Sequence, residues 1–359
     1  MTRQQSLSLR TERARSQALA GGVREAGVAA VVRRVFAVQA QDATAAGLGI
    51  RVRGREITAE GVRAAYEDQR SIVRGWLMRG TLHTVPAEEY RWLLRLLAPR
   101  LLAGTGRRYG QLGLDDGLRQ RSDRLLRRAL GEHGPLTRME LTERLTALGV
   151  APEGQAPIHL IRHAALGGIL CHGPRRDGAA TYALLDDWLP ADQPGRPEGE
   201  AAVAELARRY LAAHAPAAVE DFAAWSGLPV GWARRAWAAL ARAGATAEYG
   251  TQTVPAGWTP APRDASAAPD VRLLPAYDGY LLAYRTREES VPGPQQARVW
   301  PGGGVIRPTA LADGLAVATW SRTGARVVGI EEFEPLPSAV AEGLAVEVAA
   351  VGRFLRAEG

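Results

Sequence analysis

Two glutamines flank one small residue in the segment Gln39-Ala40-Gln41, which follows an apolar stretch that ends at Val38. A glutamine amide does not titrate, so it cannot remove a proton as a carboxylate would. Its carbonyl oxygen can nevertheless accept from a water molecule while its NH2 group donates to another acceptor. A pair of such amides can therefore hold a nucleophilic water beside a centre that develops positive charge, without itself being protonated.

The spacing of the two glutamines sets a geometric condition. Residues two apart do not share a face inside an α-helix, so Gln39 and Gln41 converge only if the preceding helix frays or turns. Residues 43–49 are expected to be loose enough for this. The competing interpretation is that both are simply polar groups at a helix end, because such a triplet is a weak motif by itself. Asp42 follows directly, and its expected role is to cap the turn after the motif.

A second unusual string, Arg74-Gly75-Trp76-Leu77-Met78-Arg79-Gly80-Thr81-Leu82-His83, is expected on a strand or wing. There Arg74, Trp76 and Arg79 would give a basic and aromatic face suited to a phosphate backbone, although a solvated face is the alternative. His83 either belongs to this face or is a hydrogen-bonded structural histidine.

The charge balance favours a nucleic-acid partner. The chain has 45 Lys+Arg against 38 Asp+Glu and a net charge of +7, with a pI near 10.0, and a pI above about 9 is typical of nucleic-acid-binding domains. No lysine occurs, so all these cations are arginines, which bind phosphate bidentately. A Schiff-base mechanism needs an amine nucleophile, and only the terminal amine could supply one.

Two other candidate sites are weak. His159 and His163 are four residues apart on one predicted helical face, near Cys171-His172. The spacing matches no established zinc pattern, and no carboxylate or second cysteine completes the set, so we expect no metal and prefer a recognition-helix or core role. Gly302-Gly303-Gly304 is not followed by Gly-Lys-Ser/Thr, so we expect no nucleotide cofactor.

The composition predicts a soluble, cytoplasmic protein without a cofactor. Apolar residues make up 46% of the 359 residues, enough to bury sizeable cores. No run of about 18 uncharged apolar residues indicates a membrane span, and residues 1–6 lead into a polar segment without a signal core. The single cysteine, Cys171, excludes an internal disulfide and fits a reducing compartment.

Hydrophobic periodicity predicts an α+β protein of three tandem winged-helix modules with a β-rich C-terminal region. Residues 123–130, 140–148 and 157–166 have helical spacing, and 169–172 with 181–185 have the pattern of a two-stranded wing. The same order recurs at 200–249 and, more loosely, before Val85. The predicted domains are residues 1–115, 116–190, 198–256 and 268–359.

Short sequence motifs predict individual helix starts, turns and linkers. Thr137, with Glu140 three residues on, predicts a capping box, and Asp313-Gly314 predicts a hairpin turn. Linkers are expected at 190–197 and 255–269. In the C-terminal region we expect a final helix, 338–358, packed on strands at 271–274, 297–300, 305–306, 315–321 and 326–330.

Together the Gln39-Ala40-Gln41 triplet and the 74–83 string resemble the winged-helix DNA glycosylases of the AlkZ type, which carry a Gln-aliphatic-Gln motif. The string at 274–282 resembles one that recurs in the same superfamily, and Asp278 and Arg285 are expected to form an ion pair at a domain junction. This chain differs in having a small Ala40 at the centre of the motif. The related YcaQ branch has an acid at the second motif position, whereas here Asp42 comes one residue later.

The resemblance implies a C-shaped stack of winged-helix modules around duplex DNA. It also implies self-resistance to alkylating natural products and unhooking of interstrand crosslinks. Gln39 and Gln41 would be the catalytic residues, and Arg74, Trp76, Arg79 and His83 would contact DNA. The expected activity is monofunctional hydrolysis of the N-glycosidic bond of N7-alkylguanine in double-stranded DNA, by a monomer. The alternative is a non-enzymatic winged-helix regulator or a drug-sequestering protein.

Overall fold

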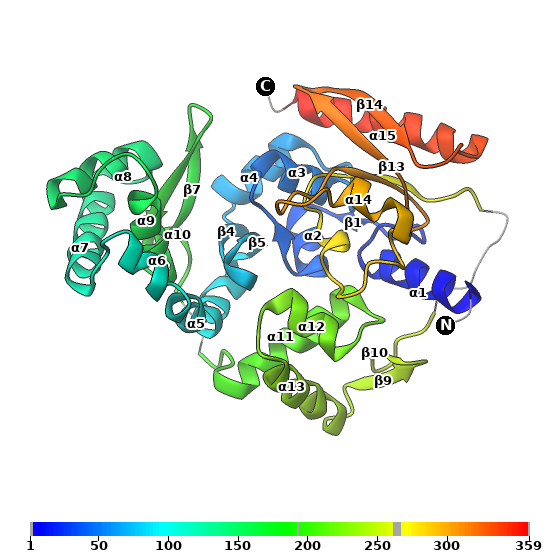
Figure 1. Ribbon diagram of the computed structural model, residues 1–359, viewed down its shortest axis with the longest axis horizontal. Helices are drawn as coiled ribbons and strands as arrows, with labels where there is room; N and C mark the ends of the chain where they lie inside the picture. Colours follow the sequence, from blue (N-terminus) through cyan, green and yellow to red (C-terminus); the bar gives the residue numbers. More distant parts are fainter. Residues whose placement is uncertain (1–2, 192–193, 261–266, 358–359) are drawn as a thin grey trace. The chain divides into compact units, whose positions relative to one another are not determined.

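The computed structural model describes residues 3–191, 194–260 and 267–357, and it divides into two compact units. The larger unit contains Met1–Val62 and Val203–Gly359, and the smaller unit contains Arg63–Ala202. The two divisions along the chain fall within helices α4 (Ala59–Glu67) and α11 (Gly199–His214). Helices and strands are mixed in both units (Figure 1), as the α+β prediction requires.

The smaller unit begins with a hairpin and ends as a winged helix. Strand β4 (Ile72–Trp76) pairs antiparallel with β5 (Leu82–Pro86) around the 3-10 turn Met78–Gly80. The remaining elements, in chain order, are α5 (Ala87–Ala103), α6 (Gly106–Gln111), α7 (Asp116–His133), β6 (Leu136–Thr137), α8 (Arg138–Leu145), the 3-10 turn Thr146–Leu148, α9 (Ala156–Leu166), β7 (Leu170–Arg176), β8 (Ala179–Leu184) and α10 (Leu185–Trp188). Strand β8 lies between β6 and β7. From α7 onward this is the element order that the sequence predicted for residues 116–190.

The start of α8 is fixed by the predicted capping box. The Glu140 amide donates to the Thr137 hydroxyl at 3.2 Å, and the Thr137 amide donates to the Glu140 carboxylate at 2.7 Å. Both orphan donors at this helix end are therefore satisfied.

The third helix of this winged helix, α9, is covered within its own unit. Arg162 donates to the Gly80 carbonyl at 3.4 Å, and the rings of His159 and His163 meet Tyr109 of α6 edge-on at 6.1 and 5.8 Å. Of the two roles considered for the histidines, the structure therefore favours packing over groove recognition.

The larger unit brings the N-terminal segment together with the C-terminal half of the chain. Besides α11, its helices are α1 (Arg3–Ser16), α2 (Val28–Val35), α3 (Ala43–Arg51), α12 (Val219–Ser226), α13 (Val230–Arg242), α14 (Gln296–Val299) and α15 (Ser338–Arg356), with 3-10 turns at Gly279–Leu281 and Gly293–Gln295. Its short strands are β1 (Glu25–Ala26), β2 (Val38–Gln39) and β3 (Gly54–Arg55), and β9 (Thr246–Tyr249) and β10 (Gln252–Pro255) form an antiparallel hairpin.

A four-stranded antiparallel sheet forms the C-terminal part of this unit. Its order is β11 (Val271–Leu274), β12 (Thr309–Ala312), β13 (Leu315–Thr323) and β14 (Arg326–Glu332). The final helix α15 packs on β11 and β14, as predicted (Figure 1). Asp313 and Gly314, with φ of 49° and 78°, make the predicted two-residue turn.

Two strands predicted in this region are wrong. Residues 297–300 belong largely to the single helical turn α14, which follows Pro292 and a 3-10 turn and buries Val299. Residues 305–306 form no strand, and Val305 makes only an isolated bridge to Gly302. One helical turn can bury an apolar residue as well as a short strand does, so the pattern alone could not separate them.

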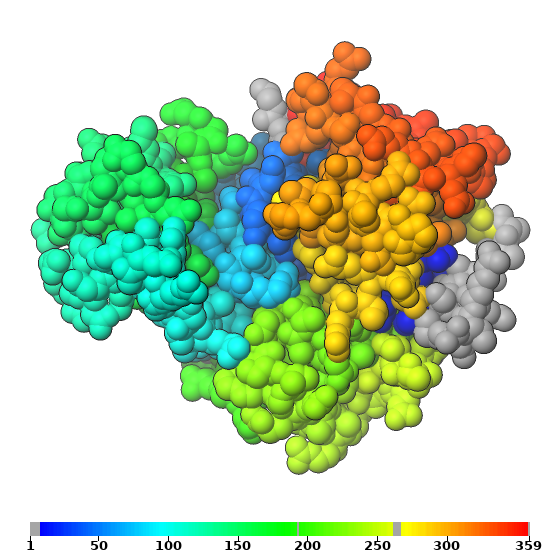
Figure 2. Space-filling model, viewed as in Figure 1, coloured from blue at the N-terminus to red at the C-terminus, as the bar shows by residue number. Residues whose placement is uncertain are grey.

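The segment that follows β11 packs on the helices of the third predicted module. The hydroxyl of Tyr210 in α11 donates to the Ala283 carbonyl at 2.8 Å, and the Arg285 amide donates to Asp221 of α12 at 2.8 Å. In Figure 2 this segment, in golden yellow to light orange, meets the green surface of those helices. Among the described residues, no helix is both long and apolar enough to cross a membrane.

Candidate active site

The two motif glutamines do not lie at a frayed helix end: Gln39 belongs to the short strand β2, and Gln41 follows in a bend. Helix α2 stops at Val35 because Phe36 adopts a left-handed conformation, with φ of 55°. The chain then extends through β2, where successive side chains point to opposite faces. Ala40 is fully buried, whereas Gln39 is half-buried and Gln41 is exposed. Gln39 thus lies at the end of the strand, and Gln41 lies beyond it, in the bend before the next helix.

The residues after the motif are helical, contrary to the loose segment that we expected. Asp42 caps this helix, α3, by accepting from the Ala45 amide at 2.8 Å, so its predicted capping role is confirmed. Residues 46–51 are all buried. A helix buried on every side has no amphipathic period, and glycines at 47 and 49 lower its propensity, which explains why the sequence favoured a loop.

Gln39 lines a small hollow in the larger unit. The other lining residues are Gln17, Val35, Ala37, Val38, Ala45, Gly49, Arg53, Pro275, Ala276, Tyr277, Asp278 and Gly279. The space open to the centre of a water molecule is about 10 Å³, which is roughly what one ordered water requires. The hollow can therefore hold a water but not a nucleobase. Gln41 is not among the lining residues.

The charged groups of the hollow neutralise one another. Arg53 donates through both terminal nitrogens to Asp278, at 2.7 and 2.8 Å, and the two side chains are only 3% and 2% exposed. Arg53 also donates to the Gly49 carbonyl at 2.8 Å and to the Gln17 amide oxygen at 3.3 Å. No other charged side chain occurs among the described residues that line the hollow. The site therefore offers no free acid.

The predicted ion pair between Asp278 and Arg285 is wrong. Asp278 is fully engaged by Arg53 and by the Tyr280 amide, which donates to it at 2.9 Å. Arg285 instead donates its main-chain amide to Asp221. A sequence contains several arginines that could reach one carboxylate, and only the folded chain selects the partner.

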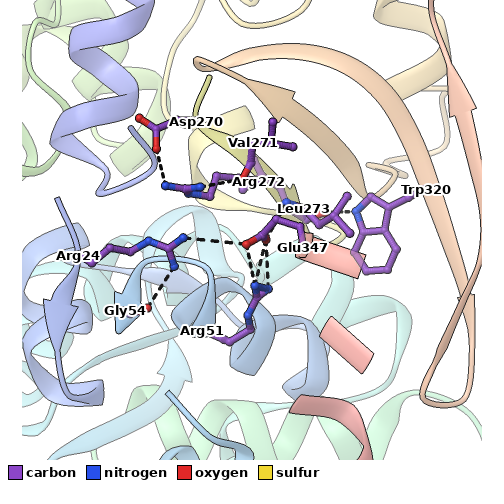
Figure 3. Close-up of polar contacts among 10 residues, drawn as sticks. Arg24, Arg51, Gly54, Asp270, Val271, Arg272, Leu273, Trp320 and Glu347 are labelled. Atoms are coloured by element: carbon purple, nitrogen blue, oxygen red, sulfur yellow. Dashed lines mark hydrogen bonds and ion pairs between the residues drawn. The ribbon is translucent and has the colours of Figure 1, made fainter. Parts of the chain in front are cut away.

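A second buried ion pair anchors the other end of α3 (Figure 3). Arg51 donates to Glu347 of α15 through contacts of 3.0 to 3.2 Å, and Arg24 lies 3.9 Å from the same carboxylate. Glu347 also accepts from the Leu273 amide of β11 at 3.3 Å. The helix that Asp42 caps is thus tied to the strand that leads into the hollow.

Two of the residues predicted to contact DNA are buried in the smaller unit. Trp76 lies in its core, with its ring 5.3 Å from that of His172 and stacked at 6.4 Å on Tyr182. His83 is 1% exposed, and its Nδ1 donates to the Thr81 carbonyl at 3.0 Å. Burial lowers the pKa of His83 to about 3, so the ring is neutral. Both positions argue against direct DNA contact, and the structural interpretation of His83 is the better one.

Arg74 and Arg79 are half-buried in the same hairpin. Arg79 adopts a left-handed conformation, with φ of 56°, inside the 3-10 turn. Burial lowers the pKa of its guanidinium from the ordinary value, although an arginine keeps its charge under all physiological conditions. These two arginines stay candidate DNA contacts.

Comparisons with known proteins identify the class to which this arrangement belongs. The DNA glycosylase AlkZ-like family matches residues 32–354. The chain belongs to this family. It is 28% identical over 347 residues, covering 89% of each chain, to a curated Streptomyces sahachiroi protein named interstrand DNA cross-link repair glycosylase. The solved structure of Streptomyces sahachiroi DNA glycosylase AlkZ has the same fold, with a TM-score of 0.78 at 24% identity, and the match covers 99% of this chain and 97% of that one.

This AlkZ-like chain is therefore a DNA glycosylase with an α+β fold, as the resemblance implied. Gln17 and Arg53 of the hollow were missed in the sequence. Arg53 had a weak signal, since Arg51 and Arg53 interrupt an apolar stretch. Gln17 had none, because its role depends on distant partners: its NH2 group donates to the Ala213 carbonyl at 2.7 Å and lies 3.1 Å from His214 Nδ1.

Proposed function

We propose that this DNA glycosylase hydrolyses the N-glycosidic bond of N7-alkylguanine in double-stranded DNA, acting as a monomer. Gln39 holds the nucleophilic water in the hollow, and the exposed Gln41 orients it or the sugar from the solvent side. The transition state of such a reaction resembles the oxocarbenium ion of glycoside hydrolysis. Two neutral amides can face that cation without being protonated.

The observation that carries this proposal is the absence of a free acid among the described residues that line the hollow with Gln39. A neutral base needs a proton from the enzyme to leave, whereas guanine alkylated at N7 is already cationic and needs none. The locked Asp278 cannot give or take a proton without leaving Arg53 as an unpaired buried charge. The site therefore suits activated, positively charged leaving groups.

The substrate range follows from the size of the hollow. A water-sized space cannot receive an extruded base in the way of the snug pockets of base-flipping enzymes. A bulky adduct or an interstrand crosslink is then no harder to accommodate than a methyl group. The name of the curated relative supports including crosslinks among the substrates, in keeping with a role in self-resistance.

The deciding experiment is single-turnover release of base from a duplex with one N7-methylguanine. We expect Gln39→Ala and Gln41→Ala to lower the rate by about 100-fold or more, the usual effect of removing one positioned hydrogen-bonding group from an active site, while duplex binding is kept. Gln120→Ala, which removes an exposed glutamine of α7, is the matched control. Tight DNA binding without release by the native protein would favour the regulator or sequestration alternative.

The chemistry should also be monofunctional. The chain contains no lysine, so borohydride treatment during turnover should trap no covalent protein–DNA adduct through a side-chain amine. A trapped adduct would contradict hydrolysis by water alone.

A further inference from the structure

Tyr277, in the wall of the hollow, has a conformation that tyrosine rarely adopts. Its φ is 60°, in the left-handed region where the Cβ of any residue other than glycine is crowded. Among the described non-glycine residues with positive φ, Tyr277 is the one that lines the hollow with Gln39. Strained residues of this kind persist where the surroundings fix them, and they cluster at functional sites.

The chain on both sides of Tyr277 is fixed. Before it, the Leu274 carbonyl accepts from the Trp320 indole at 2.7 Å. After it, Asp278 forms a buried bidentate ion pair with Arg53. The backbone at Tyr277 therefore cannot relax without breaking a buried contact on one side or the other.

The side chain of Tyr277 lacks the contacts that its neighbours have. The hydroxyls of Tyr210, Tyr280 and Tyr284 are buried and donate to main-chain carbonyls at 2.8, 2.9 and 2.9 Å. Tyr277 is half-buried, and within residues 3–191, 194–260 and 267–357 it forms no hydrogen bond and no ring contact. Packing within the protein thus does not account for an aromatic residue at this strained position.

We infer that Tyr277 is a further substrate-contacting residue, whose ring stabilises the positive charge of the alkylated nucleoside beside the water held by Gln39. The inference rests on the proposed function. Because the hollow is water-sized, the nucleoside must lie over its rim, where the half-buried Tyr277 and Gln39 are both within reach. The one carboxylate of the hollow is neutralised, so it cannot face the cation. An aromatic face attracts a cation through its quadrupole and cannot take up a proton.

The test separates the electrostatic effect of the ring face from the effect of the ring's shape. We would compare Tyr277→Phe, Tyr277→Leu and Tyr277→pentafluorophenylalanine in single-turnover release of N7-methylguanine by the full chain. The phenylalanine variant should keep the rate within about twofold, because the ring face is retained. The leucine and pentafluorophenylalanine variants should lose about tenfold, since one lacks the ring and the other has nearly the same shape with a reversed quadrupole.

A second pair of variants distinguishes loss of the contact between the Tyr277 ring and the substrate from loss of protein stability. Tyr277→Gly removes the ring and relieves the backbone, so the midpoint of urea unfolding should not fall while base release still drops. Glu56→Gly is the matched control, because Glu56 is an exposed residue with φ of 56°, and its release rate should equal that of the native protein.

The inference is overturned if pentafluorophenylalanine supports release as well as phenylalanine does, if leucine is fully active, or if phenylalanine is as poor as leucine, which would assign the role to the hydroxyl. Gln39→Ala in the same assay distinguishes the two levels of failure. If base release depends on Gln39 but not on the Tyr277 ring, only this inference is wrong. If the native protein releases no N7-methylguanine, the proposed function is wrong, and the inference with it.

Discussion

At the residue level, the surroundings of Gln39 favour a neutral amide over a charged side chain. A carboxylate in the same place would be the stronger base, but it would lie beside the buried pair of Arg53 and Asp278 and would compete with Asp278 for the guanidinium. A neutral side chain leaves that pair undisturbed. The proposed restriction to cationic leaving groups is thus a consequence of the whole hollow and not of one residue.

Asp42 is the nearest residue to the motif that could act as a base, and its contact argues that it does not. Its carboxylate accepts from the Ala45 amide as the N-cap of α3, and asparagine caps a helix about as well as aspartate. Asp42→Asn should therefore keep both stability and the rate of base release. Asp42→Ala should lower the free energy of unfolding by about 1 kcal/mol. If the asparagine variant stays folded but loses release, the carboxylate takes part in the chemistry.

At the level of elements, the predictions that succeeded depended on neighbours along the chain. The capping box at Thr137 and the turn at Asp313-Gly314 are local arrangements, and both formed as expected. The failures required distant partners. Helix α3 has no visible period because it is buried all round, and the short strand β2 could not be told from the end of the apolar helix before it.

In the candidate site, too, features that depend on neighbouring residues were predictable and features that depend on distant partners were not. Gln39 and Gln41 were found because the motif is contiguous, and the string that contains Asp278 was noticed for its own sequence. The arrangement of Gln39 and Asp278 around one hollow could not be predicted, because its lining residues Gln17, Arg53 and Asp278 are far apart in the chain. The burial of Trp76 could not be predicted either, because strand alternation predicts which residues share a face, but not which face is buried.

The anchor of α3 by Glu347 yields a prediction at this scale. Glu347→Gln would leave Arg51 and Arg24 without their buried counter-charge, and breaking a buried pair in this way costs about 3–5 kcal/mol. Asp68→Asn removes one side of an exposed pair with Arg63 and should cost less than about 1 kcal/mol. Urea unfolding of both variants measures the contrast.

The rate of base release supplies a second readout for the same change. Because the motif directly precedes α3, Glu347→Gln should also slow release at temperatures where the protein is still folded. The double change Arg51→Met with Glu347→Leu removes both charges of the pair and should recover much of the stability. If Glu347→Gln and Asp68→Asn lowered the free energy of unfolding equally, the buried pair would not stabilise α3.

For the whole molecule, the buried histidines set how stability depends on pH. His83 and His172 in the smaller unit and His214 in the larger unit are buried, and burial lowers the pKa of each to about 3. In the unfolded chain the pKa is about 6.5, so below that pH the unfolded state binds more protons than the folded state. Their contribution is fully favourable above pH 6.5 and is lost progressively as the pH falls toward 3.

The expected slope is up to about 1.4 kcal/mol per pH unit for each histidine. Asp123 opposes it in part, because burial raises the pKa of its carboxyl to about 6 and the folded state then binds the extra proton as the pH falls. We predict that the urea midpoint drops between pH 7 and pH 5 and that His172→Phe, which keeps a ring beside Trp76 and Tyr182, flattens the decline. An unchanged slope in that variant would mean that His172 takes up no proton on unfolding, and the pH dependence would have to come from other groups.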